Sequence, residues 1–358
     1  MSSRAKLILE DGSVYDALSF GSEKSVSGEL VFYTAMIGYP ESLTDPSYKG
    51  QILVPTFPMI GNYGVPDDEV ENGISRNFES DKIHCTALVI SDYSEKFSHW
   101  NSDRNLGTWL KQQDVSGLYG IDTRALTKKL RERGAMLGKI VFGEEDIPFH
   151  DPNKENLVAQ VSTEEVRYYG NGKYKVLLVD CGVKNNIMRC LLKHDVTIKR
   201  VPWNYDFTHE DYDGLFISNG PGDPAMCTET VEHIKVALQG DRPIMGICLG
   251  NQLMALAAGA KTYKMKYGHR GHNQPVKVPG THTCYITSQN HGFAIDDKTL
   301  PQDWKPLFVN LNDGTNEGIA HVEKPFFSAQ FHPEASSGPV DTESLFATFV
   351  ENMKKNRK

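Results

Sequence analysis

The chain has 358 residues, 39% of them hydrophobic and 23% charged, which is enough sequence for two globular domains with a core each. Its formal net charge of -8 argues against nucleic acid, or an anionic membrane surface, as the main partner. The six cysteines include no C-x-x-C pair and the twelve histidines show no metal-ligand spacing, so we expect reduced thiols and no metal site.

The start of the chain and its apolar runs indicate the cellular compartment in which the protein is expected. No run approaches the roughly 18 apolar residues that a membrane-spanning helix needs. The first residues lead directly into strand-like sequence, with neither the apolar core of a signal peptide nor a long transit peptide rich in Arg and Ser. We therefore expect a cytoplasmic protein.

Residues 1–155 are predicted to form a first domain of mixed α and β structure. Asp122 is a suitable N-cap for a helix over 123–133, and Gly134 would end it. Turn residues dominate two segments, 38–48 and 58–66, which we expect to be loops. Short apolar runs bounded by Gly, Pro, Asp and Ser predict strands at 7–9, 30–33, 52–54 and 85–90.

Residues 156–173 are polar and contain helix breakers, so we expect a linker there, followed by a second domain over 174–358. Strands that alternate with helices predict a mainly parallel sheet covered on both faces. The elements expected in this part are strands at 176–179, 196–198, 215–217 and 244–247, and helices that end near 193, run over 230–238 and run over 251–258.

The pattern changes after residue 258. His269 and His272 lie in a segment rich in Gly and Asn, which predicts a loop and surface or packing roles for both rings. Later apolar runs have no helix between them and predict antiparallel strands added to the sheet, before a closing helix over 341–353. These runs are 276–278, 284–287, 307–309, 318–321 and 326–331.

A Gly-x-Cys-x-Gly unit joins the apolar strand at 244–247 to the following helix. Gly246 and Gly250 remove side chains where strand and helix crowd, which lets Cys248 adopt a strained conformation and expose its thiol. A helix N-terminus behind the sulfur favours the thiolate, and the Leu249 amide can face an oxyanion. The same pentapeptide also fits a structural cysteine buried between strand and helix.

A base for this thiol is predicted 84 residues later in the chain. His332 and Glu334 are two residues apart in an extended segment, so their side chains can share a face. Alone, each fits an ordinary loop histidine or a solvated glutamate. In the same domain as Cys248 they predict a Cys-His-Glu triad, in which His332 moves the proton and Glu334 orients the ring.

The segment 218–224 directly follows a predicted strand and contains two glycines. Loops at the carboxyl ends of parallel strands are where α/β sheets bind ligands, and glycine lets backbone amides approach a substrate carbonyl. A tight strand-to-helix turn explains the same residues equally well. No phosphate loop of the G-x-x-x-x-G-K-[ST] type is present, so we expect no ATP site of that kind.

Several motifs together carry a resemblance to known families. The second half resembles class I (triad-type) glutamine amidotransferases, and the first half is similar to the small subunit of carbamoyl-phosphate synthetase. The segment 263–275 is closer still to the animal-type multifunctional pyrimidine-synthesis proteins. The motifs in the second half are Gly246–Gln252, Asn219–Pro224, Gln289–Phe293 and Phe331–Glu334, and those in the first are Gly38–Tyr48, Ile60–Gly64 and Gly120–Arg124.

The resemblance implies roles for individual residues. Cys248 would be the nucleophile with His332 and Glu334 as its partners, and the amides of Gly220 and Leu249 would form the oxyanion hole. Asn251 departs from the family, where many members have His after the Gly-x-Cys-x-Gly unit, so we expect altered packing there. The residues expected to hold glutamine are Ser47, Gly220, Gly222, Leu249, Gln252, Asn290, Gly292 and Phe293.

The function implied by the resemblance is hydrolysis of L-glutamine to supply ammonia for carbamoyl phosphate synthesis, most simply for pyrimidines. Ammonia-dependent relatives have Ser in place of the nucleophile, so Cys248 argues for glutamine. The expected partner is a synthetase, as a large subunit or a fused domain, that would bind ATP, bicarbonate and Mg²⁺; we expect no cofactor in this chain. Alternatives are a small subunit of the arginine pathway, a stand-alone γ-glutamyl hydrolase and a non-catalytic regulatory subunit.

Overall fold

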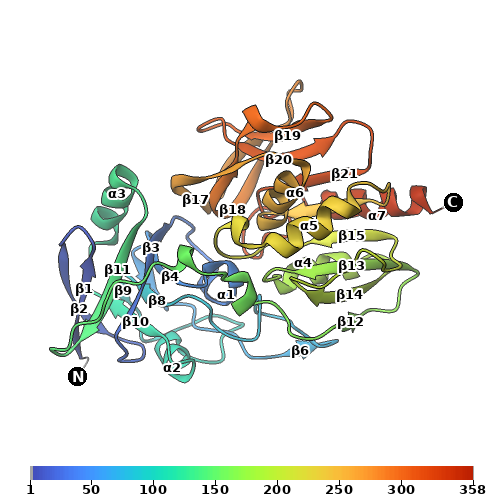
Figure 1. Cartoon of the computed structure of the whole chain (residues 1–358). Coiled ribbons are helices and arrows are strands. Elements are labelled where there is room, and N and C mark those ends of the chain that lie inside the picture. The colour runs from blue at the N-terminus through green and yellow to red at the C-terminus, as the bar shows by residue number, and fades with distance from the viewer. Residues whose placement is uncertain (1–2, 358) are drawn as a thin grey trace. The chain divides into compact units, whose positions relative to one another are not determined.

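A computed structural model describes residues 3–357, which fold as two compact units (Figure 1). The first unit contains the chain up to Glu71 and Ser75–Lys154, and the second contains Asn72–Ile74 and the chain from Glu155 onward. No helix among residues 3–357 is long and apolar enough to cross a membrane.

The strands of the first unit close into a barrel in the order β1-β11-β3-β4-β8-β10-β2. Parallel pairs join β3, β4, β8 and β10, and antiparallel pairs complete the ring. The bounds of the barrel strands are β1 (Arg4–Leu9), β2 (Val14–Ser19), β3 (Val26–Tyr33), β4 (Gln51–Pro55), β8 (Ala87–Val89), β10 (Ser116–Tyr119) and β11 (Met136–Phe142). The mixed α/β character predicted from sequence is confirmed, whereas β2, β10 and β11 were not predicted.

The helices of the first unit follow local signals closely. In α3 (Thr123–Arg133) the Asp122 side chain accepts a hydrogen bond from Ala125 N at 2.9 Å, and Gly134 ends the helix with a φ of 111°. The prediction of a loop over 38–48 was partly wrong. A short helix begins there at Tyr39, with Pro40 in its first turn, and Asp45 caps a 3-10 turn by accepting from Ser47 N at 2.9 Å.

The remaining elements of this unit are short. They are α1 (Tyr39–Thr44), the 3-10 helices η1 (Pro46–Tyr48) and η2 (Pro152–Lys154), α2 (Leu106–Gln112), β5 (Met59–Ile60) and β9 (Asp92–Tyr93). The strands β6 (Val70–Glu71) and β7 (Ile74–Ser75) lie where the chain passes between the two units.

The second unit is built on one sheet, in the order β12-β14-β13-β15-β16-β21-β20-β19-β17-β18 within the described residues. The pairs from β14 to β21 are parallel and those beyond β21 are antiparallel, which confirms the predicted sheet. Its strands are β12 (Arg167–Tyr169), β13 (Tyr174–Asp180), β14 (Val196–Pro202), β15 (Gly214–Ile217), β16 (Ile244–Ile247), β17 (Thr262–Lys277), β18 (Cys284–Ile295), β19 (Trp304–Asn310), β20 (Asn316–His321) and β21 (Phe326–Ala329).

Helices cover both faces of this sheet (Figure 1). Residues of β13 alternate between the faces: Leu177 and Val179 pack with α5 and α6, while Val176 and Leu178 pack with α4 and α7. The elements are α4 (Asn185–Leu192), α5 (Thr228–Ala237), α6 (Leu249–Ala258), α7 (Ser344–Asn356) and the 3-10 helices η3 (Val158–Gln160), η4 (Pro224–Met226) and η5 (Asp297–Thr299). Two apolar layers therefore enclose the parallel strands.

Three segments of this unit differ from the sequence-based expectations. The segment predicted as a linker over 156–173 contains β12, which pairs antiparallel with β14 and belongs to the second unit. The segment at 326–331 was expected to add an antiparallel strand, but β21 pairs parallel with β16 over four residues. The intervening strands β17–β20 serve as the crossover that a parallel pair requires.

The third difference is β17, where the sequence predicted a loop around His269 and His272. This segment is a 16-residue strand that pairs with β18, with register shifts at Lys264/His269 and Gly271/Gln274. Glycine inside a strand often marks a bulge rather than a loop. The glycines near His269 therefore mark irregularities of a strand.

Candidate active site

Cys248 lies at the turn between β16 and α6, as the Gly-x-Cys-x-Gly unit predicted. Its φ of 54° is in the left-handed region, and its side chain is only 2% exposed. A Cβ on Gly250 would come within 2.2 Å of the Ile217 carbonyl oxygen, and a Cβ on Gly246 within 2.6 Å of Gly250 itself. Both glycines are thus required by the close approach of strand, turn and helix.

His332 follows β21, the strand next to β16. Its backbone N donates to Ser288 O at 2.8 Å, and its Nδ1 lies 2.7 Å from Glu334 Oε1. Because a carboxylate only accepts, Nδ1 carries the proton of this bond. The other nitrogen, Nε2, makes no hydrogen bond in the described part of the chain. Because Nδ1 is bound to Glu334, Nε2 is the nitrogen that remains for Cys248. An interaction with Cys248 is one of the causes that raise the pKa of His332.

Burial and charge act in opposite directions on this histidine and glutamate. Burial lowers the pKa of His332, but the charge of Glu334 and the interaction with Cys248 outweigh it and raise the pKa. Burial raises the pKa of Glu334, but the charges of Lys184 and His332 outweigh it and lower the pKa. At neutral pH the pair is therefore an imidazolium and a carboxylate, which places a positive charge beside Cys248.

Lys184 is a member of the site that the sequence analysis missed. It precedes α4, at the carboxyl end of β13, and its Nζ lies 3.0 Å from Glu334 Oε1 and donates to Ala335 O at 2.7 Å. Side chains at the carboxyl ends of parallel strands converge at one edge of a sheet. The same rule pointed to the residues after β15 and β16. The residues after β13 also meet its condition, so it could have identified Lys184 as well.

The structure brings several predicted glutamine-binding residues close to the thiol. Cys248 Sγ faces the carbonyl oxygen of Asn290 at 3.6 Å. Gln252 Nε2 donates to the Phe293 carbonyl oxygen at 3.0 Å, which ties α6 to β18. A Cβ on Gly220 would touch the Leu249 side chain, so the two predicted oxyanion-hole residues are neighbours.

Three further residues were predicted to hold glutamine. Gly222 follows Gly220 in the loop after β15 and has a φ of 84°, and Gly292 lies between Asn290 and Phe293 on β18. Ser47 lies in the 3-10 helix η1 of the first unit, so its assignment to glutamine stays a prediction.

Asn251, the departure from the family pattern, lies behind the turn rather than in the triad. Its Nδ2 donates to Gln330 Oε1 at 2.9 Å and its Oδ1 accepts from Ser328 Oγ at 2.7 Å. Gln330 Oε1 also accepts from Gln252 Nε2 at 3.1 Å. The amide therefore joins α6 to β21 in a fully buried network.

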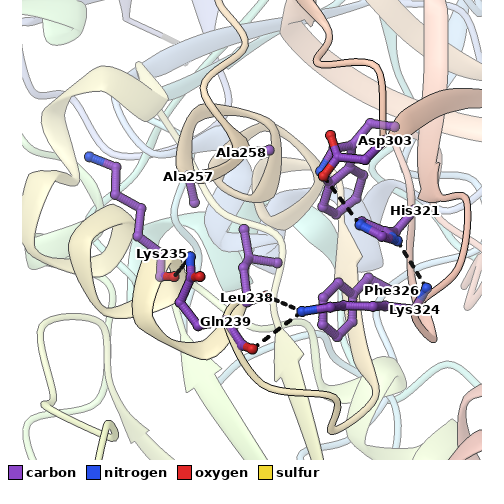
Figure 2. Close-up of a pocket in the computed structure, with 10 residues that line it drawn as sticks. Lys235, Leu238, Gln239, Ala257, Ala258, Asp303, His321, Lys324 and Phe326 are labelled. Atoms are coloured by element: carbon purple, nitrogen blue, oxygen red, sulfur yellow. Dashed lines mark hydrogen bonds and ion pairs between the residues drawn. The ribbon is translucent and has the colours of Figure 1, made fainter.

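A cavity of about 380 Å³ lies elsewhere on the second unit, between the ends of α5 and α6 and strands β19–β21 (Figure 2). Phe326, at the first position of β21, lines it, whereas Cys248 follows the last position of the adjacent parallel strand β16. The cavity is thus at the amino-terminal edge of the parallel strands, opposite the thiol. Lys324 Nζ crosses it to the carbonyl oxygens of Leu238 and Gly240, both at 2.9 Å.

One group of described residues has the chemistry of metal ligands. The candidate ligand atoms of His269, His291 and Glu317 lie within 4.8 Å of one another and are buried. The sequence spacing gave no sign of this group, because its members come from three different strands.

Family comparisons match both units. Residues 177–352 match the family described as "Glutamine amidotransferase class-I", and residues 7–140 match "Carbamoyl-phosphate synthase small chain, CPSase domain".

Individual relatives match almost the whole chain. "Multifunctional protein CAD" of Squalus acanthias is 53% identical over 97% of this chain and 16% of its own length. "Multifunctional protein pyr-3" of Neurospora crassa is 50% identical over 98% of this chain and 21% of its own length. "Carbamoyl-phosphate synthase [ammonia], mitochondrial" of Homo sapiens is 50% identical over 99% of this chain and 24% of its own length. The chain thus spans a quarter or less of these relatives.

The charge of Glu334 can be tested through the thiol itself. In Glu334→Gln the imidazolium of His332 loses its main counter-charge, so its pKa falls and the positive charge beside Cys248 is weakened. We expect alkylation of Cys248 by iodoacetamide at pH 7 to slow by about tenfold, the effect of one pKa unit. Mass spectrometry of the Cys248 peptide measures the rate, and a rate equal to the wild type contradicts the assignment.

Lys184 is expected to matter for stability as well as for the charge of Glu334. Lys184→Met leaves a buried carboxylate without its cation, which we expect to lower the free energy of unfolding by about 3 kcal/mol. Urea unfolding measures it. Lys193→Met is the matched control, because Lys193 pairs with Glu343 at the exposed end of the same helix and such pairs contribute about 0–1 kcal/mol. Equal losses in both variants would show that burial of the Lys184 pair is unimportant.

Proposed function

Since the chain belongs to the family that joins a carbamoyl-phosphate synthase small-chain domain to a class I glutamine amidotransferase domain, we propose that it hydrolyses L-glutamine and delivers ammonia for carbamoyl phosphate synthesis. One observation carries the proposal. A cysteine in a left-handed turn at a helix N-terminus lies beside a buried His332–Glu334 pair, in which Glu334 Oε1 binds Nδ1 and leaves Nε2 for the thiol.

The geometry supports a two-step reaction. Cys248 Sγ attacks the carbon of the side-chain amide, and the amides of Gly220 and Leu249 receive the negative oxygen. His332 then gives its proton to the departing nitrogen, which leaves as ammonia from a γ-glutamyl thioester. In the second step His332 takes a proton from water, the hydroxide breaks the thioester, and glutamate and the thiolate are released.

The nucleophile decides between glutamine and free ammonia as the nitrogen source. Overall identity does not decide it, because the human relative whose name specifies ammonia is 50% identical to this chain. Cys248 supplies the sulfur that thioester chemistry requires, and its backbone conformation and partners are those of an activated thiol. We therefore assign glutamine as the substrate.

The ammonia needs an acceptor, which we propose is a carbamoyl-phosphate synthetase that binds ATP, bicarbonate and Mg²⁺. The small-chain match over residues 7–140 and the much greater length of the relatives support this. The synthetase would be a separate large subunit or a further part of a longer polypeptide. The similarity to CAD and pyr-3 favours pyrimidine synthesis as the pathway, with arginine synthesis as the alternative.

The proposal predicts a separation between two activities. Cys248→Ser should reduce glutamate release from glutamine by at least about 1,000-fold, because a neutral hydroxyl replaces the thiolate. The same variant, combined with a carbamoyl-phosphate synthetase large subunit, should make carbamoyl phosphate from added ammonia at the wild-type rate. Coupled assays of glutamate and of carbamoyl phosphate measure the two.

Other outcomes would assign a different function. Loss of both activities to the same extent would contradict a separate ammonia-delivering site. Cleavage of γ-glutamyl peptides but not glutamine would indicate a stand-alone hydrolase. A wild-type chain that releases no glutamate, alone or with the large subunit, would indicate a non-catalytic subunit.

A further inference from the structure

A charged cluster lies behind the strand that carries the predicted glutamine-binding residues. Its buried members are His269 on β17, His291 on β18 and Glu317 on β20, and the exposed Asp313 joins it from the turn before β20. His269 Nε2 lies 2.8 Å from Asp313 Oδ2, and His269 Nδ1 lies 3.2 Å from Glu317 Oε1. The triad uses none of these side chains.

The two carboxylates fix the charge of His269. Burial lowers the pKa of His269, but the hydrogen bonds to Asp313 and Glu317 outweigh it and raise the pKa to about 9. Each ring nitrogen has a carboxylate oxygen within hydrogen-bond distance, so the two carboxylates also fix the orientation of the ring.

His269 packs directly against His291. The two rings meet edge to face at 86°, with 5.0 Å between centroids, and His291 Nε2 is 3.9 Å from Glu317 Oε1. Burial and the neighbouring charges of His269 and Arg270, on β17, hold the pKa of His291 well below its usual range. Its ring is neutral and carries one proton.

His291 in turn holds the β18 backbone on which the substrate residues lie. Its Nδ1 is 2.9 Å from the Phe293 carbonyl oxygen, and its Nε2 is 3.2 Å from Gln289 Oε1. Both oxygens only accept, so either nitrogen that carries the proton donates to this strand. The ring thus bridges residues 289 and 293, on either side of Asn290, whose carbonyl faces the thiol.

The Phe293 carbonyl oxygen links the His291 ring to helix α6. It accepts from His291 and also from Gln252 Nε2 at 3.0 Å, and Gln252 lies one turn after Cys248. A change at His269 therefore reaches two predicted substrate contacts, the β18 segment and Gln252, through one neighbouring ring. The reacting pair contacts β18 only through backbone oxygens, those of Asn290 and Ser288, and the His332–Glu334 contact lies outside this path.

We propose that His269, held between Asp313 and Glu317, is a positioning residue for glutamine recognition. It fixes the His291 ring, and through the Phe293 carbonyl it fixes the Gln252 side chain and the β18 segment that receives the substrate. This inference rests on the proposed function, because it assigns the cluster to the binding of the same substrate. It separates recognition of glutamine from the chemistry at the thiol.

The experiment compares His269→Asn and Asp313→Asn with the wild type in steady-state glutaminase assays. We expect the KM for glutamine to rise by about tenfold in His269→Asn, equivalent to the loss of roughly one hydrogen bond, and by less in Asp313→Asn. The kcat should stay within about twofold, because the triad is untouched. His269→Gln, whose amide can donate to one carboxylate, should give an intermediate KM.

Two controls separate positioning from general damage. Asp303→Asn removes the carboxylate of another histidine–aspartate pair, since His321 Nε2 lies 3.3 Å from Asp303 Oδ2 at the far edge of the sheet (Figure 2). It should leave the KM unchanged. Iodoacetamide alkylation of Cys248 without glutamine should proceed at the wild-type rate in all four variants.

The possible results are distinct. If the wild type hydrolyses glutamine, two results overturn the inference. One is an unchanged KM in His269→Asn, and the other is a fall in kcat and in the alkylation rate as large as the rise in KM. The inference is also overturned if the wild type binds one transition-metal ion per chain and His269→Asn binds none, because the cluster would then be a metal site. A wild type without Cys248-dependent glutaminase activity instead overturns the proposed function, and the inference with it.

Discussion

The left-handed turn at Cys248 is the constraint on which the rest of the second unit depends. A non-glycine residue in that conformation costs about 1–3 kcal/mol unless its surroundings hold it in place. Here the restraint comes from both sides, because Gly250 packs on the Ile217 carbonyl of β15 and Cys248 N donates to Ala329 O of β21 at 2.8 Å. The strain is sustained by three adjacent strands, which are also the strands whose ends carry the site.

A second constraint is the electrical balance of the buried site. Lys184 and an imidazolium at His332 bring two positive charges into the interior, and Glu334 brings one negative charge. Because unpaired buried charges are strongly unfavourable, each positive group depends on the Glu334 carboxylate, and Lys184 and His332 together keep that carboxylate ionised.

The sequence predicted what short-range patterns encode. The Cys248 turn follows from two glycines at fixed spacing, the His332–Glu334 pair from the two-residue period of an extended chain, and α3 from its Asp122 cap. The parallel pairing of β21 depends on sheet order, which no local pattern specifies. The His269 cluster was missed for the same reason, since it joins side chains from strands distant in sequence, whereas Lys184 lies at a strand end to which the rule for parallel sheets also applies.

The position of β21 beside β16 has a consequence for how such a site can diversify. The strand before the nucleophile and the strand before the base are hydrogen-bonded neighbours, with Ile247 opposite Ala329, so a backbone ladder sets their spacing. The chain between them, α6 and β17 to β20, carries Asn290 and Phe293. Substitutions there can change the surroundings of the thiol while the reacting pair keeps its separation. Selectivity and reactivity can therefore evolve on separate parts of one sheet.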